Sequence, residues 1–118
     1  MYVRIKRIYD PPADHDGARV LVDRVWPRGV RKADAALDEW CRDAAPSTGL
    51  RKWFGHDPAR FDAFARHYRD ELAARPETVD HLRALARADG LTLLYAARDP
   101  EHNHARVLAA FLAGQGHG

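Results

Sequence analysis

A short and largely apolar segment near the end of the chain, residues 91–96, constrains the fold more than any other feature of the sequence. It has the length of a strand, yet it lacks the alternation of polar and apolar residues typical of a strand with one face in water. Amphipathic helical patterns stand on both sides of it, with Gly90 before it and Asp99-Pro100 after it. A strand that is apolar on both faces must be covered on both faces, so the pattern predicts a small α/β domain.

The remaining elements follow from periodicity and from turn-forming residues. Residues 2–9 and 19–26 carry β-branched side chains and end at Pro or Gly, which predicts two further strands. A helix is predicted from about Asp34 to Pro46, with one apolar stripe made of Leu37, Trp40, Cys41 and Ala44. We expect a central, at least partly parallel sheet of three to five strands, covered by helices, whose strand order the pattern does not determine.

Three further helices have clear beginnings, and a fourth is recognised by its apolar stripe and its end. Ser47 is a candidate cap for a short helix that Gly55 ends. Asp57 as N-cap, with Pro58 at the first helical position, predicts the next one, and Asp99-Pro100 repeats that arrangement near the end of the chain. Between these two, an apolar stripe and a closing Gly90 predict a helix before the apolar strand.

Composition indicates one soluble domain spanning residues 1–118. The chain is 46% hydrophobic and 31% charged, as globular proteins are. No apolar run reaches the roughly 20 residues of a membrane helix, and the N-terminus has no signal-like hydrophobic block. Cys41 is the single cysteine. We therefore expect a cytoplasmic protein without membrane association, whose oligomeric state the sequence does not indicate.

The charge pattern gives only weak support to nucleic-acid binding. The net charge is +2, and the excess of positive charge lies in the first 31 residues. Proteins that bind nucleic acid usually present a strongly basic face or domain. The later arginines alternate with acidic residues at helical spacing, which is typical of solvated helix faces.

The junction between the last strand and the last predicted helix, residues 95–104, is the first candidate site. Open α/β sheets usually bind ligands where strands end, and the free N–H groups of a helix N-terminus favour anions. Arg98 adds a guanidinium group suited to phosphate or carboxylate. Two interpretations of Asp99 stand side by side: it caps the helix and occupies those N–H groups itself, or it belongs to an anion site.

The residues between Asp23 and Gly29 form the second candidate site. Strand alternation places Asp23 on one face and Arg24 and Trp26 on the other. In a structural interpretation, Asp23 pairs with an arginine and Trp26 packs beneath helices. In a functional one, Arg24 and Arg28 line a pocket with Trp26 as its wall, and that pocket suits a phosphorylated or nucleotide-like ligand.

The histidines raise the possibility of a metal site. If the last helix has begun by residue 100, His102 and His104 point about 200° apart and cannot share one ion. His104 falls in the buried stripe, as either a hydrogen-bonded core residue or a general acid–base. His15 and His56 are unspecific candidates for ligands. The sequence identifies no cofactor, and Ser47 and Cys41 stand at positions that do not favour nucleophilic catalysis.

Three segments resemble a known family: VLVDRVWPRG (20–29), LRKWFGHDP (50–58) and LLYAARDPEHNH (93–104). With residues 37–40 and 45–47 between them, the resemblance to the YeaO-like branch of the domain of unknown function 488 family covers nearly the whole chain. The family has no assigned activity, so the resemblance implies no particular reaction.

The wider family differs from this chain in its last motif, which typically reads Leu-Leu-Cys-x-Glu and then Cys-His-Arg. Tyr95 stands at the first Cys, Ala97 at the Glu, Asn103 at the second Cys and Ala105 at the Arg, and His104 alone is retained. If the two Cys and the Glu carry redox or metal chemistry in those relatives, this chain cannot perform it in the same way.

The leading functional hypothesis is an enzyme that acts on an anionic substrate bearing a phosphate or a nucleotide. Its anion would be held by Arg24, Arg28 and Arg98, and protons would be transferred by Asp23, Tyr95 and His104. The hypothesis requires the turn after the second strand to lie beside residues 95–104.

Two other classes of function remain open. One is a non-catalytic module that binds a small ligand, a protein or nucleic acid. The other is a metal-dependent enzyme that uses His15, His56 or His102 with a nearby Asp.

Overall fold

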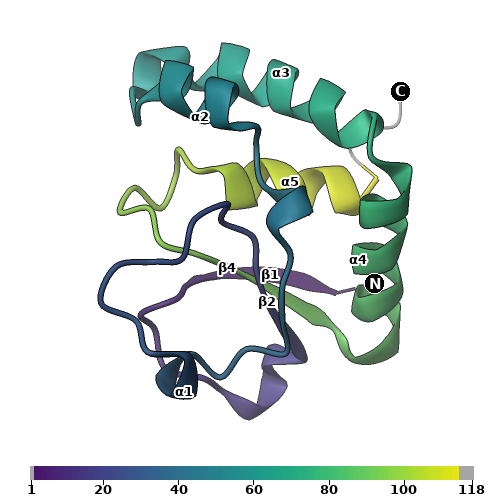
Figure 1. The fold of residues 1–118 in the computed structure, drawn as a ribbon. Helices are drawn as coiled ribbons and strands as arrows, with labels where there is room; N and C mark the ends of the chain where they lie inside the picture. The colour runs from purple at the N-terminus through teal and green to yellow at the C-terminus, as the bar shows by residue number, and fades with distance from the viewer. Residues whose placement is uncertain (1, 115–118) are drawn as a thin grey trace.

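Within residues 2–114, which the computed structural model describes, four parallel strands form one sheet in the order β1–β4–β2–β3 (Figure 1). The strands are β1 (Val3–Arg7), β2 (Ala18–Leu21), β3 (Glu39–Trp40) and β4 (Leu91–Tyr95). The apolar strand β4 is central, because it pairs with β1 on one side and with β2 on the other. The prediction of a small α/β fold with a sheet of three to five strands is confirmed.

Five α-helices occur in the same range: α1 (Lys32–Ala35), α2 (Thr48–Phe54), α3 (Phe61–Ala73), α4 (Pro76–Asp89) and α5 (His104–Leu112). The Ser47 hydroxyl accepts the Leu50 N–H at 3.2 Å and caps α2, and Gly55 ends that helix with a φ of 56°. The Asp57 carboxylate accepts the Ala59 N–H at 3.0 Å and begins a 3-10 turn that leads into α3. These predicted caps are confirmed. None of the described helices has the length and hydropathy that a membrane span requires.

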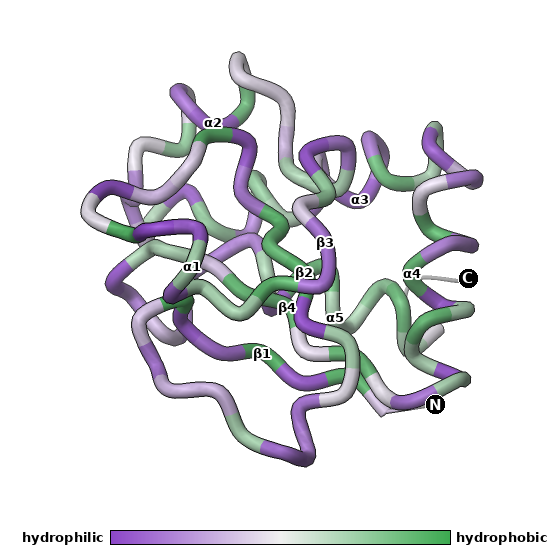
Figure 2. Tube along the Cα trace, turned by 60° about the horizontal axis from the view of Figure 1, so that its bottom comes forward, coloured by the Kyte–Doolittle hydropathy of each residue, from purple (hydrophilic) through white to green (hydrophobic). Residues whose placement is uncertain are grey.

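The two faces of the sheet are covered by different structures. Helices α4 and α5 pack on the face that carries Val20 and Leu93, α3 packs on α5, and this side holds the main core. The opposite face, which carries Leu21 and Leu94, is covered by residues 26–40, so helical cover there is limited to the single turn of α1. Figure 2 shows hydrophobic colour along β2 and β4 in the middle of the molecule.

The helix predicted from about Asp34 to Pro46 is wrong. After one turn of helix the chain extends and adds β3 to the edge of the sheet. The Asp38 N–H donates to the Arg19 carbonyl at 2.9 Å, and the Asp38 carboxylate accepts the Arg19 N–H at 2.8 Å. The Cys41 N–H donates to the Leu21 carbonyl at 2.8 Å. These bonds to the sheet replace the bonds that a continued helix would make.

The prediction that Asp99 caps the last helix is wrong by about one turn. Helix α5 is capped by Asn103, which is buried and uses both ends of its amide. Its Oδ1 accepts the Arg106 N–H at 3.1 Å, and its Nδ2 donates to the Asp99 carbonyl at 2.9 Å. The Asp99 carboxylate instead accepts the N–H groups of Glu101 and His102, at 2.8 and 3.0 Å, and holds a turn that precedes the helix.

Candidate functional site

The two segments singled out in the sequence come together because β2 and β4 are neighbours. Parallel strands end at the same edge of a sheet, so the residues after β2 meet the residues after β4. Two hydrogen bonds join them: the Val22 N–H donates to the Leu94 carbonyl at 3.0 Å, and the Ala96 N–H donates to Asp23 Oδ2 at 3.1 Å. This is the carboxyl edge at which open α/β sheets bind ligands.

A pocket of about 550 Å³ lies at this edge. Its walls are built by the segment after β2, by α2 and α3, and by the connection from β4 to α5. Figure 1 shows α2, α3 and the start of α5 on the same side of the molecule. The charged and titratable groups that line it include Asp23, Arg24, Arg51, Arg98, Asp99 and His104. All three segments that carry the family resemblance contribute to the wall.

Two arginines of the pocket have no protein partner among residues 2–114. Arg98 is exposed, and its guanidinium group makes no hydrogen bond or ion pair within that range. The exposed guanidinium group of Arg51, on α2, is free in the same way. Guanidinium groups present a planar set of donors that matches phosphate and carboxylate oxygens. The pocket therefore offers unoccupied donors for an anion.

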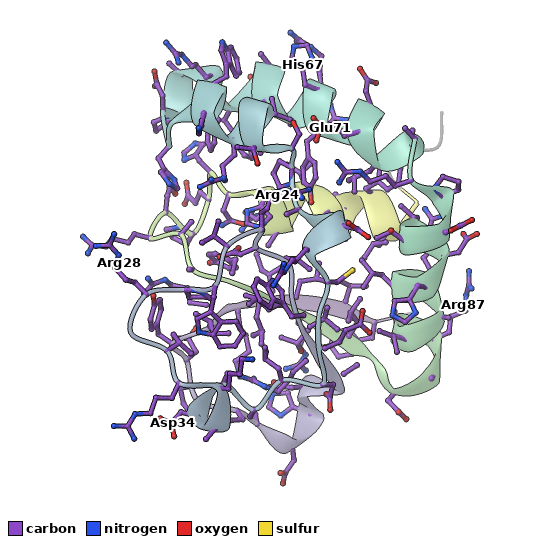
Figure 3. The ribbon with its side chains drawn as sticks, in the orientation of Figure 1. Arg24, Arg28, Asp34, His67, Glu71 and Arg87 are labelled. Carbon is purple, nitrogen blue, oxygen red and sulfur yellow. The ribbon has the colours of Figure 1, made fainter. Side chains whose placement is uncertain are left out.

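Arg24 lies in the same pocket but has a structural task. Its Nε donates to the Pro46 carbonyl at 3.1 Å, and its Nη2 donates to the Ala45 carbonyl at 3.2 Å. These bonds tie the segment after β2 to the residues that lead into α2. Two of the five guanidinium N–H groups are used in this way, so donors remain for a ligand. In Figure 3 Arg24 lies in the interior of the molecule, whereas Arg28 extends outward from the loop.

Asp23 and His104 form a contact in the pocket wall. His104 Nε2 is 3.1 Å from Asp23 Oδ1 and 3.1 Å from the Val22 carbonyl oxygen, and the geometry of a hydrogen bond is met only toward Val22. Because a carbonyl oxygen only accepts, Nε2 carries a proton. Asp23 Oδ1 is left buried without a hydrogen bond, with the imidazole as its neighbour. Such a carboxylate–imidazole pair is a common arrangement for general acid–base work.

Asp99 supports the turn before α5. The hydrogen bond from the Glu101 N–H, together with those from His102, lowers the pKa of the Asp99 carboxyl. Its Oδ2 is 2.9 Å from His102 Nδ1. Both carboxylate oxygens are therefore engaged within residues 99–102, and Asp99 shapes the pocket rim.

Three residues proposed from the sequence do not line the pocket. Trp26 lies against the opposite face of the sheet, where its Nε1 donates to the Val30 carbonyl at 2.7 Å and its ring packs edge-on against Trp40. Arg28 is exposed on the loop. Tyr95 is buried in the main core, and this burial raises the pKa of its hydroxyl.

Several pocket residues were missed in the sequence because they fall on helices. Arg51 and Phe54 were included only in the short predicted helix, and Phe64 only in an apolar stripe. Their contribution depends on α2 and α3 packing above the sheet edge, which no local pattern predicts. The available signal was the presence of residues 50–58 among the three segments of the family resemblance.

The described residues contain no group of three or more His, Cys, Asp or Glu side chains placed to hold a metal ion. The candidates His15 and His56 lie far apart in the chain, and Asp16, next to His15, is buried in ion pairs with Lys6 and Arg19. His102 lies before α5 and contacts Asp99 alone among acidic groups.

Comparison with known proteins places the chain in a family. A family model described as the inactive DUF488-N3 subclade matches residues 2–117. The chain is 46% identical over 112 residues to uncharacterized protein YeaO of Escherichia coli (strain K12), covering 95% of this chain and 97% of YeaO. It is 44% identical over 113 residues to uncharacterized protein Rv3073c of Mycobacterium tuberculosis, covering 96% and 95%. No solved structure matches the chain at a significant level. The chain therefore belongs to the DUF488 family, in the DUF488-N3 subclade that matches nearly its whole length, with YeaO as a relative.

Proposed function

We propose that this protein binds a small anionic molecule, bearing a phosphate or carboxylate group, in the pocket at the carboxyl edge of β2 and β4. The observation that carries the proposal is the guanidinium group of Arg98, which lines the pocket with no partner among residues 2–114. Arg98 is an exposed residue, so its donors can meet an anion without first giving up a protein partner. Arg51 and the remaining donors of Arg24 stand in the same pocket.

Binding without chemistry agrees best with the other residues. Ser47, the only serine, donates its hydroxyl to Glu71 Oε2 at 2.5 Å and caps α2. Burial raises the pKa of the Cys41 thiol, which makes it a poor nucleophile. Neither side chain lines the pocket. The description of the matching subclade as inactive also supports a binding protein.

Replacing Arg98 with glutamine is expected to weaken binding of inorganic phosphate or pyrophosphate by about tenfold or more, because a charge-assisted hydrogen bond is lost. Isothermal titration calorimetry of the purified protein measures the change. Arg28→Gln, on the exposed loop, and Arg69→Gln, in a separate groove between α3 and α5, are matched controls that should bind as the unaltered protein does. Absence of any binding heat with the unaltered protein, at millimolar phosphate or pyrophosphate, would refute the proposal.

The contact between Asp23 and His104 supports a second candidate, an enzyme that hydrolyses a phosphate ester. Water would attack phosphorus as the bond from phosphorus to the departing oxygen breaks, and His104 would give its Nε2 proton to that oxygen. Asp23 would take the proton that the water loses and pass it back to His104, which lies 3.1 Å from its Oδ1. Tyr95 lies outside the pocket lining and has no part in this candidate.

Release of phosphate from phenyl phosphate distinguishes the two candidates. For an enzyme, His104→Gln is expected to lower the rate by about 10²–10⁴-fold, whereas the Kd for inorganic phosphate changes little. Binding of phenyl phosphate without any release of phosphate by the unaltered protein would eliminate hydrolysis and leave the binding function.

A further inference from the structure

One apolar side chain at the pocket is unusually open to solvent. Val25 is 58% exposed, the highest value among the large hydrophobic residues that are exposed in the described part of the chain. It stands directly after Arg24, in the segment that follows β2, and it lines the pocket. Single exposed apolar residues are common on protein surfaces, but this one borders a cavity that is apolar beneath it.

The floor of the pocket is aromatic and well packed. Phe54 on α2 and Phe64 on α3 stack with their ring centroids 4.4 Å apart and an angle of 20° between the planes. Both are almost fully buried, at 6% and 1% exposure, so the floor is held by the core and is already formed without a ligand. Pro46 adds a third apolar surface beside them.

The volume of the pocket exceeds what a lone oxyanion requires. Its 550 Å³ lies in the range of pockets for organic ligands, about 300–1,000 Å³. Donors on Arg51 and Arg98 account for a charged group, but they leave the exposed side chain of Val25, beside the buried Pro46 and Phe54, without a function. A ligand with an apolar group that covers Val25 gains the free energy of removing that side chain, and its own apolar group, from water.

We infer that the ligand is an organic anion with an apolar group about the size of a six-membered ring, which covers Val25 and contacts Pro46 and Phe54 while Arg51 and Arg98 hold its charge. This inference rests on the proposed anion-binding function and adds the chemical class of the ligand. The apolar part and the charge are both required, because the same cavity presents both kinds of surface.

A series of phosphate monoesters tests the inference by calorimetry, with methyl, cyclohexyl and phenyl phosphate as the probes. Cyclohexyl and phenyl phosphate are expected to bind with Kd values about tenfold or more below that of methyl phosphate, since each buries several more carbon atoms. Val25→Ser should raise the Kd of cyclohexyl and phenyl phosphate several-fold while leaving the Kd of methyl phosphate unchanged. Tyr2→Ser is the matched control, because Tyr2 is an exposed apolar side chain before β1, at the other edge of the sheet.

The outcomes separate this inference from the function on which it rests. Equal Kd values for methyl and phenyl phosphate, with both weakened by Arg98→Gln, overturn the inference and leave anion binding in place. A tighter phenyl phosphate that Val25→Ser does not weaken overturns the placement of the ring at Val25. Failure of every ester and of inorganic phosphate to bind overturns both proposals.

Discussion

Replacing Asp16 with alanine is expected to lower the free energy of unfolding by about 3–5 kcal/mol, because it leaves a buried arginine without its counter-charge. Asp16 is 2% exposed, and its Oδ2 lies 2.6 Å from Arg19 Nη1 and 3.1 Å from Lys6 Nζ. The same oxygen accepts the Ala13 N–H at 3.0 Å. The cluster therefore joins β1, the turn before β2, and β2 itself.

Urea unfolding followed by circular dichroism measures this loss. Asp14→Ala is the matched control, since Asp14 is an exposed acid in the same turn, and its removal should change the unfolding free energy by less than about 0.5 kcal/mol. Equal midpoints for Asp16→Ala and the unaltered protein would show that the cluster does not stabilise the fold.

The pH dependence of stability provides a second measurement of the same cluster. Burial opposes ionisation of Asp16, but hydrogen bonds from Ala13, Lys6 and Arg19 outweigh it and lower the pKa of Asp16 from 3.8 to about 2. A folded-state pKa below the unfolded value stabilises the folded protein above pH 3.8, and this contribution is lost as the pH falls toward 2. In Asp16→Asn the stability should therefore fall less steeply over this interval.

Replacing Asp23 with alanine is expected to cost about 2–3 kcal/mol of stability and to abolish anion binding. The Ala96 N–H loses its acceptor, and the imidazole of His104 loses the carboxylate beside it. The Ala96 N–H, two residues before Arg98, donates to Asp23 Oδ2 at 3.1 Å. The imidazole of His104 lies against Asp23 Oδ1. Without the carboxylate, the segment that carries Arg98 is no longer held to the end of β2.

Asp23→Asn is the conservative variant for this experiment. Its amide oxygen still accepts the Ala96 N–H, but its NH2 group then faces the Nε2–H of His104, so thermal stability and phosphate affinity should fall between those of the unaltered protein and of Asp23→Ala. Thermal unfolding and calorimetry on the three proteins measure both quantities. Normal phosphate binding by Asp23→Ala would show that Arg98 is positioned independently of Asp23.

Local signals predicted the elements whose ends are decided locally. The caps at Ser47 and Asp57, the stop at Gly55 and the buried strand before Tyr95 depend on residues a few positions apart, and all were predicted. The choice between Asp99 and Asn103 as the cap of α5 was different, because either side chain can cap a helix. In the folded protein Asn103 is buried and caps α5, and this burial depends on residues far from it in the sequence.

Features that depend on distant partners were missed or only partly predicted. The two-residue strand β3 exists because Asp38 and Cys41 bond to β2, and no pattern in residues 34–44 predicts that pairing. Arg24 was predicted at the site, but its bonds to the Ala45 and Pro46 carbonyls depend on the arrangement of α2. The pairing of β2 with β4 was the spatial assumption that the functional hypothesis required, and the structure has it.

The position of β1 at the border of the sheet affects how copies of the protein meet in concentrated solution. Its outer side pairs with no other strand in residues 2–114, and such a border can recruit a strand from a neighbouring molecule and start aggregation. Three of its five residues, Arg4, Lys6 and Arg7, are positively charged. Two copies that approached border to border would bring like charges together, so this strand resists forming a continuous sheet between molecules.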